Sequence, residues 1–156
     1  MSLVIRQRIL SLTDAYDICD ESGEARYSVW TEFFTLGHRI HVIDVKTGLE
    51  AGRINEKTFT FLHRAVVESR VETFEIVREL SFFKPRYSVS NGWSIAGNFT
   101  GWDYEIKDDL GRTVASVSKE IFRFSDTYTL SCEDPSNELT ALLCAITIDM
   151  MNCGNN

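Results

Sequence analysis

The sequence predicts a mainly β protein: a single twelve-stranded antiparallel β-barrel built from repeated hairpins around a central hydrophobic C-terminal α-helix. Three observations support this prediction. A triplet of an apolar or aromatic residue, a variable residue and a β-former recurs six times, at spacings of 17 to 25 residues. Most copies are followed by a turn signal and a second β-rich segment. The last copy is followed by an apolar run of the kind that forms a helix enclosed by protein.

An opening strand is predicted near Leu3–Leu10, and six strands that carry the triplet follow it. Apolar and polar residues alternate in most of them, as in Tyr104-Glu105-Ile106. This period of two is expected of a strand with one buried and one wet face. The six strands are centred on Tyr16–Ile18, Ile40–Val42, Ala65–Val67, Tyr87–Val89, Tyr104–Ile106 and Tyr128–Leu130.

Five of these strands are expected to form hairpins with a return strand. Most of the intervening segments place Gly or Asn where a hairpin turn can need a positive φ angle, as in 20–23 and 44–48. The predicted return strands are Arg26–Val29, Ala51–Ile54, Glu72–Val77, Trp93–Ala96 and Thr113–Val117. Aromatic stretches should join one hairpin to the next and pack over the sheet ends; they include Phe33-Phe34, Phe59 with Phe61, Phe82-Phe83, Phe99 with Trp102, and Phe122 with Phe124.

The sixth unit predicts a helix over 135–152 in place of a hairpin. Asp134 is suited to cap the helix and Pro135 to occupy its first turn. From Leu139 onward nearly the whole circumference is apolar, so the helix should be surrounded by protein. Twelve strands favour closure into a barrel, which removes exposed edges, and such a barrel is too wide for strand side chains to fill alone. The helix is the expected plug.

Length and composition limit the possible classes of protein. The 156 residues fit one domain spanning 1–156, and the net charge of -7 without a basic run argues against a nucleic-acid partner. The start of the chain lacks a signal-peptide pattern, which predicts a cytoplasmic protein and leaves peripheral association with a membrane open. The apolar run Leu139–Met151 is too short to be transmembrane, since a spanning helix needs about 20 residues.

No catalytic or metal site is evident, and no cofactor is predicted. The four cysteines form no Cys-x-x-Cys pair, and His38, His41 and His63 lack a convergent further ligand. Phosphate-binding and nucleophile motifs are also missing. The acidic residues fall in turns and on solvent-exposed strand faces, where charged side chains are expected without any catalytic role. We therefore expect a protein that is not an enzyme.

The charge distribution gives one candidate site. Between Phe33 and Val89 there are 9 Lys and Arg against 7 Asp and Glu, whereas the rest of the chain has 7 against 16. Basic residues precede or begin three successive triplet strands, and they would collect at one barrel rim beside the aromatic stretches. The candidate residues for binding an anion or lipid headgroup are Arg39, Arg64, Lys84 and Arg86. In the alternative interpretation, these residues pair with Glu56, Glu68, Glu75 and Glu79 on solvated strand ends, and the phenylalanines cover the barrel end.

The chain resembles the LURP-one-related family of the tubby C-terminal-like superfamily. The resemblance rests on the six triplets, on 82–87 (Phe-Phe-Lys-Pro-Arg-Tyr), on 101–106 (Gly-Trp-Asp-Tyr-Glu-Ile) and on the apolar tail. It spans almost the whole chain and implies the same barrel around a central helix. Superfamily relatives include tubby domains, which bind phosphoinositides through a basic pocket, and phospholipid scramblases. The lipid-binding residues of tubby have no matching positions here, so none is assigned.

Together these observations predict a non-enzymatic binding or scaffold module that recognises an anionic phospholipid headgroup or a protein partner through a barrel rim. One alternative is a carrier barrel for a small ligand, which the helical plug disfavours. Another is a hydrolase that uses Asp103 or Asp17 with a histidine. The oligomeric state is left open, although exposed phenylalanine pairs would suit a homodimer interface.

Overall fold

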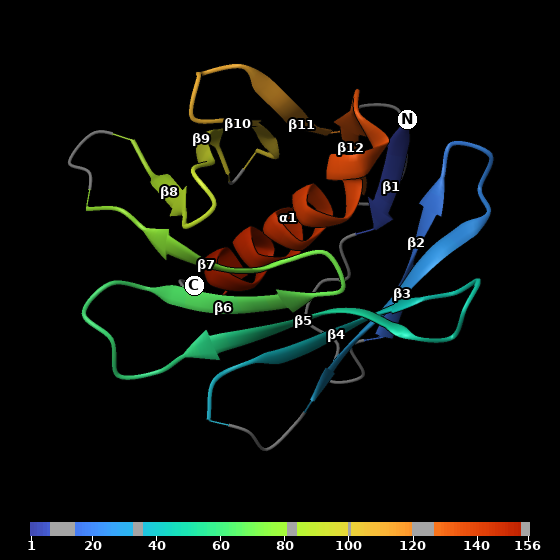
Figure 1. Cartoon of the computed structure of the whole chain (residues 1–156), viewed down its shortest axis with the longest axis horizontal. Helices are drawn as coiled ribbons and strands as arrows, with labels where there is room; N and C mark the ends of the chain where they lie inside the picture. The colour runs from blue at the N-terminus through green and yellow to red at the C-terminus, as the bar shows by residue number, and fades with distance from the viewer. Residues whose placement is uncertain (7–14, 33–35, 81–83, 100, 120–126, 154–156) are drawn as a thin grey trace.

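In the computed structural model, twelve antiparallel strands close into one barrel around a single α-helix (Figure 1). The structure describes residues 1–6, 15–32, 36–80, 84–99, 101–119 and 127–153. Each strand pairs with its neighbours in the sequence, and the first pairs with the last. The strands are β1 (Ser2–Arg6), β2 (Ala15–Asp20), β3 (Ala25–Glu32), β4 (Arg39–Asp44), β5 (Glu50–Lys57), β6 (Arg64–Ser69), β7 (Thr73–Arg78), β8 (Arg86–Val89), β9 (Ser94–Asn98), β10 (Asp103–Lys107), β11 (Thr113–Lys119) and β12 (Thr127–Cys132). The predicted fold is confirmed.

The two rims of the barrel differ in how the chain crosses them. All even-numbered strands run in one direction, because every neighbouring pair is antiparallel and follows the sequence order. The five hairpin turns therefore lie together at one end, which we call the turn rim. The links between hairpins lie at the other end, which we call the connection rim. In its described part, the connection rim includes 36–38, 58–63, 79–80, 84–85 and 101–102.

Short polar side chains shape the hairpin turns. Oδ1 of Asp20 accepts hydrogen bonds from the backbone N–H groups of Ser22 and Glu24, and Asp108 does the same for Leu110 and Arg112. In both turns a glycine adopts the positive φ that the sequence predicts, as also happens at the turns that follow β4 and β8. The turn that follows β6 contains no glycine and uses the Ser69 hydroxyl as acceptor instead. Each turn thus ends its strand locally and fixes the register of its hairpin.

The helix begins where β12 ends. A 3₁₀ turn η1 (Pro135–Asn137) is capped by the Asp134 side chain, and α1 (Glu138–Cys153) continues from it. The structure thus refines the predicted span 135–152 into a 3₁₀ turn followed by an α-helix of 16 residues. In the part of the chain that the structure describes, no helix is both long and apolar enough to cross a membrane.

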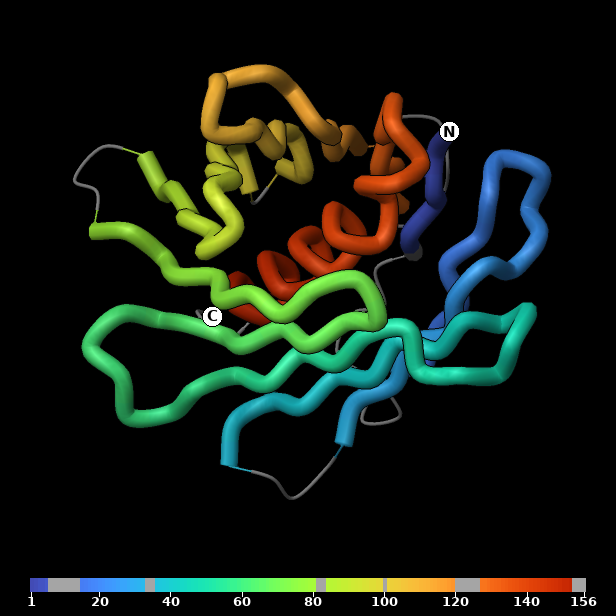
Figure 2. Tube along the Cα trace, viewed as in Figure 1, coloured from blue at the N-terminus to red at the C-terminus, as the bar shows by residue number. Residues whose placement is uncertain are grey.

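The helix occupies the centre of the barrel, and the strands surround it (Figure 2). Inward-facing residues alternate along the strands, as with Ile40 and Val42 on β4, and they meet a helix whose side chains are buried on nearly every face. Leu142, Leu143, Cys144 and Ala145 are all 0% exposed. One continuous hydrophobic core therefore runs between helix and wall, as expected for a plugged barrel.

Polar contacts hold the helix at both rims. At the turn rim, Oε1 of Glu138 lies 3.2 Å from the Arg26 guanidinium, and the Thr140 hydroxyl donates to Glu72 at 3.1 Å. Near the connection rim, the Tyr87 hydroxyl donates to Oδ1 of Asn152 at 3.3 Å. These contacts join the helix to the barrel wall at both of its ends.

The aromatic links differ from the expectation in one respect. Phe99 is buried and packs edge-on against Tyr87, as predicted for a residue that covers the sheet end. Phe59 and Phe61, in contrast, are 96% and 92% exposed, so the prediction that they pack over the barrel end is wrong. The short link 58–63 places both side chains outside the core. The stretches Phe33-Phe34, Phe82-Phe83 and Phe122 with Phe124 lie outside the described residues.

Gly52 on β5 is expected to be intolerant of a side chain. A Cβ atom at this position would lie 2.8 Å from both Cδ atoms of Leu143, which is itself fully buried. We expect Gly52→Ala to lower the free energy of unfolding by about 1–3 kcal/mol, the usual cost of overpacking a core. Urea denaturation measures this change. In a Leu143→Ala background the clashing atoms are absent, so the same substitution should cost less; an equal cost in both backgrounds would show that the close approach to Leu143 is irrelevant.

Candidate functional site

The structure places the candidate basic residues at the connection rim. Arg39, Arg64 and Arg86 are the first residues of β4, β6 and β8, and Lys84 lies in the link just before β8. Because these three strands run in the same direction, their first residues lie at the same rim. The sequence positions of these four residues therefore correspond to a common place in the fold.

The three arginines face outward and do not converge on one point. Each is followed by an inward-facing buried residue, namely Ile40, Ala65 and Tyr87. Adjacent strands are about 4.8 Å apart, so arginines on every second strand are separated by roughly 10 Å along the wall. Such spacing suits contact with an extended anionic surface better than enclosure of one small anion.

Each arginine is paired with a glutamate. Arg64 lies 2.9 Å from Glu75 and Arg86 lies 3.5 Å from Glu79, two of the four glutamates that the alternative interpretation named. Arg39 contacts Glu32 at 3.2 Å and donates from Nε to the Asn55 side chain. All three pairs are at least partly solvent-exposed, and exposed ion pairs of this kind contribute only about 0–1 kcal/mol. A stronger anion at the rim can therefore compete for these arginines at little cost to the fold.

The histidines are bonded to glutamates in two clusters, one at the connection rim and one on the outer wall of β4. Glu56 of β5 contacts His38 Nδ1 at 3.2 Å through one oxygen and His63 Nε2 at 3.0 Å through the other. Burial acts to raise the pKa of Glu56, but the hydrogen bonds from His63 and His38 outweigh it and hold the pKa below its usual value. Glu56 thereby joins the links that precede β4 and β6.

His41 forms the second cluster, on the outer wall of β4. Its Nδ1 lies 2.8 Å from Glu50 and its Nε2 lies 2.9 Å from Glu32, while the Trp30 ring stacks on it at 4.1 Å. Carboxylates only accept hydrogen bonds, so both bonds form together when the ring carries both N–H groups. Sequence reasoning missed both clusters, since they depend on cross-strand register such as Trp30 opposite His41.

The residues suggested for a hydrolase do not meet. Asp17 and Asp103 are exposed on β2 and β10, whereas the imidazoles of His38, His41 and His63 bond to Glu32, Glu50 and Glu56. Among the residues that the structure describes, no three His, Cys, Asp or Glu side chains are arranged to hold a metal ion. Cys19, Cys132 and Cys144 are free thiols, and burial raises the pKa of Cys144 far above its usual range.

A partly buried carboxylate on the helix is a further feature that the sequence did not reveal. Asp149 accepts hydrogen bonds from the Tyr128 hydroxyl at 2.6 Å and from Trp102 Nε1 at 3.0 Å. Burial raises the pKa of Asp149 despite these two donors. The nearby Tyr104 hydroxyl is buried and has no hydrogen-bond partner among the described residues. Asp149 therefore fixes the helix to β12 and to the link before β10.

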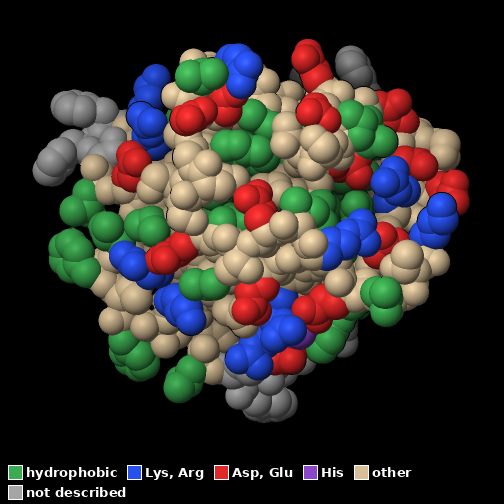
Figure 3. All heavy atoms as spheres, in the orientation of Figure 1, with side chains coloured by type: hydrophobic (Ala, Val, Ile, Leu, Met, Phe, Trp, Pro, Cys, Tyr) green, Lys and Arg blue, Asp and Glu red, His purple; other side chains and the backbone are tan. Residues whose placement is uncertain are grey.

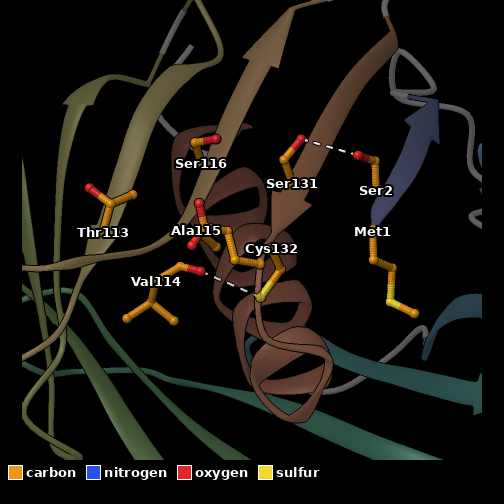
Figure 4. Close-up of a pocket in the computed structure, with 9 residues that line it drawn as sticks. Met1, Ser2, Thr113, Val114, Ala115, Ser116, Ser131 and Cys132 are labelled. Atoms are coloured by element: carbon orange, nitrogen blue, oxygen red, sulfur yellow. Dashed lines mark hydrogen bonds between the residues drawn. The ribbon is translucent and has the colours of Figure 1, made fainter.

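A surface pocket of about 250 Å³ lies at the turn rim, between β1, β11 and β12 (Figure 4). Ser2, Ser116 and Ser131 line it with outward-facing side chains, and the Ser2 and Ser131 hydroxyls lie 3.3 Å apart. The Cys132 thiol donates to the Val114 carbonyl and is thus engaged by the barrel wall itself.

Charge is unevenly distributed between the two rims, whereas exposed apolar side chains occur at both, with Leu49, Val71 and Leu110 at the turn rim. Acidic side chains predominate in the turns and at the start of α1, and basic ones at the strand ends that border the connection rim. Figure 3 shows charged and hydrophobic side chains mixed along the edge of the molecule at the left, where the link between β5 and β6 lies in Figure 1. The exposed apolar residues of the connection rim are Leu36, Phe59, Phe61 and Leu80, at 83%, 96%, 92% and 74% exposure.

Comparisons with known proteins agree with the architecture. The chain is 27% identical over 154 residues to "Uncharacterized protein YxjI" of Bacillus subtilis (strain 168), a match that covers 97% of this chain and 93% of that protein. The X-ray structure of the Arabidopsis thaliana protein AT5G01750 superposes with a TM-score of 0.66 at 13% identity, covering 97% of this chain and 91% of that one; it supports the fold alone. The sequence model described as LURP-one-related matches residues 1–149. The chain therefore belongs to the LURP-one-related family.

Proposed function

We propose that the protein is a non-catalytic binding module that attaches through its connection rim to a membrane surface rich in anionic phospholipids. The observation that carries the proposal is the charge polarity of the barrel: among the described residues, basic side chains predominate at one rim and acidic side chains at the other. A negatively charged surface attracts the first rim and repels the second. The module would therefore bind in one orientation.

The two rims carry opposite charge among the described residues. Acidic side chains of the turn rim outnumber its basic ones and include Asp20, Glu21, Glu24, Asp44, Glu72, Asp108, Asp109, Glu133 and Asp134. Basic side chains of the connection rim outnumber its acidic ones and include Arg39, Lys57, Arg64, Arg78, Lys84 and Arg86. The overall charge of -7 conceals this polarity and opposes general anion binding. Attachment would therefore depend on the local charge of the connection rim and not on the net charge of the chain.

The interior of the barrel supports a binding role over a catalytic one. The helix takes the central space where a carrier would hold its ligand, and the imidazoles are bonded to glutamates of the wall. A filled barrel is a rigid scaffold, and rigidity lowers the entropy lost when its rim binds. The arginines are spaced along this rigid wall for a broad surface.

Charge variants at the rim test the proposal in a vesicle flotation assay. Vesicles would contain phosphatidylcholine with or without about one third phosphatidylserine. A basic residue near an anionic membrane contributes about 1 kcal/mol, which is roughly fivefold in affinity. We expect Arg86→Gln to weaken binding to the anionic vesicles and Glu79→Gln, which releases Arg86, to strengthen it, each by about that factor. Arg112→Gln at the turn rim makes the same charge change as Arg86→Gln and should have little effect.

The salt and lipid dependence complete the test. Binding by wild type should require the anionic lipid and weaken as ionic strength rises. Absence of wild-type binding at low salt would overturn the membrane proposal and favour a protein partner for the rim. Equal effects of Arg86→Gln and Arg112→Gln would show that the connection rim is not the attached surface.

A further inference from the structure

The link between β5 and β6 carries two phenylalanines that the fold does not use. Of the four phenylalanines in the described residues, Phe74 and Phe99 are buried, whereas Phe59 and Phe61 are 96% and 92% exposed. Leu36 and Leu80, on the neighbouring links, are 83% and 74% exposed. Exposed apolar side chains that gather on adjacent segments indicate a contact surface. The link projects beyond the ends of β5 and β6 (Figure 2).

The tip of this link has a defined shape. The Thr60 hydroxyl donates to the Leu62 carbonyl at 2.7 Å, which closes a tight turn. Phe59 adopts a φ of 59°, in the left-handed region that bulky residues rarely occupy. The chain thus holds an aromatic residue in an unfavourable conformation while leaving its side chain in water, and nothing in the barrel core benefits from this arrangement.

The base of the link is held firmly by its neighbours. Glu56, two residues before it, accepts hydrogen bonds from His63 at its far end and from His38 on the adjacent link. The backbone N–H of Glu56 donates to the His38 carbonyl, and that of Arg78 donates to the His63 carbonyl. Gly37 packs so closely that a Cβ there would lie 2.8 Å from the Glu56 carbonyl oxygen. A loop fixed at its base can present its tip without a large loss of entropy on binding.

Basic residues flank the exposed tip. Lys57 ends β5 on one side of the link, and Arg64 begins β6 on the other. Arg64 forms an ion pair with Glu75, and Lys57 is exposed. Aromatic side chains favour the interface between lipid headgroups and acyl chains, and neighbouring lysine and arginine favour anionic headgroups. A tip of two phenylalanines between two cations thus has the chemistry of a membrane-inserting loop.

We infer that residues 58–62 insert Phe59 and Phe61 into the headgroup–acyl boundary of an anionic bilayer, with Lys57 and Arg64 in contact with the headgroups. This inference rests on the proposed function and names the element that enters the membrane. It also explains why both phenylalanines are exposed: their apolar surface leaves water when the rim is attached. Leu36 and Leu80 extend the same apolar surface over the adjacent links.

Removal of the two aromatic rings tests the inference in the same flotation assay. We expect Phe59→Ser with Phe61→Ser to weaken binding to anionic vesicles by at least about tenfold, because two large apolar side chains no longer leave water. The thermal unfolding temperature should stay unchanged, since neither ring contacts the core. The matched control is Leu49→Ser with Val71→Ser at the turn rim, where the residues are 68% and 61% exposed, and its binding should equal wild type.

A tryptophan probe measures insertion directly. The emission of Phe61→Trp should shift to shorter wavelength with anionic vesicles and be quenched by lipids brominated on their acyl chains. Leu49→Trp should show neither effect. If wild type binds anionic vesicles but the double serine variant binds equally well, the inference is wrong while the proposed function stands. If wild type binds no vesicles, both are overturned.

Discussion

A chain that ends at Asp134 is expected to lose the cooperative unfolding transition of the full-length protein. Seven large apolar side chains of the helix are at most 7% exposed, namely Leu139, Leu142, Leu143, Ile146, Ile148, Met150 and Met151. Burial of such side chains stabilises by about 1.5–3 kcal/mol each, so their loss removes roughly 10–20 kcal/mol. This loss is comparable to or larger than the 5–15 kcal/mol by which domains are usually stable. The truncated barrel would also expose the inner faces of its strands.

Calorimetry and near-ultraviolet circular dichroism would measure this loss. A chain that ends at Cys153 keeps the whole of α1 and serves as the control; it should unfold cooperatively. A cooperative transition in the shorter chain, within a few degrees of the control, would show that the strands form a stable barrel without the helix.

The second large effect is expected at Asp149. In the folded protein its pKa is raised by burial, so the carboxyl binds its proton at pH values where the unfolded chain has released it. The stability that comes from this protonation is full below the unfolded pKa of about 3.9 and is lost as pH rises through the folded value. Asp149→Asn keeps the shape without the charge. The free energy of unfolding of this variant should therefore increase, relative to wild type, as pH rises from about 4 to 7.

The comparison with wild type at each pH is needed because other carboxyl groups act in the opposite direction. Hydrogen bonds lower the pKa values of four turn or cap residues, so their contribution is lost as pH falls. These residues are Asp20, Asp44, Asp108 and Asp134. Their effects cancel in the difference between the two proteins.

Tyr128→Phe serves as the opposing variant. It removes the 2.6 Å hydrogen bond to Asp149 and leaves that carboxylate oxygen unsatisfied in the interior. Leaving a buried acceptor without its donor costs about 1–3 kcal/mol, so the variant should be less stable than wild type by about that amount. For a chain of this length, each kcal/mol corresponds to a fall in Tm of about 2–4 °C. If the stability difference between Asp149→Asn and wild type is independent of pH, burial does not raise the pKa of Asp149.

The candidate rim was only partly visible in the sequence. The repeat spacing located Arg39, Arg64 and Arg86 at equivalent positions, and an antiparallel barrel places equivalent positions at one rim. The glutamate partners of Arg64 and Arg86 were anticipated, whereas that of Arg39 was not. The contacts of one glutamate with both His38 and His63 depend on how two links lie relative to each other, and no local sequence pattern encodes this. Phe59 and Phe61 are exposed, although their apolar side chains led us to expect that they would be packed over the barrel end.

The sequence by itself determined the barrel, because its information is local and repeated. Alternation in Tyr104-Glu105-Ile106, turn residues such as Gly23, and the all-round apolar helix each specify an element and its buried face. Only the tertiary structure decided the rest: that Asp149 meets Tyr128 inside the barrel, and that Phe59 and Phe61 point away from it. Such contacts depend on strand register, helix rotation and link geometry, which arise when distant segments pack together and cannot be obtained from the periodicity of any one segment.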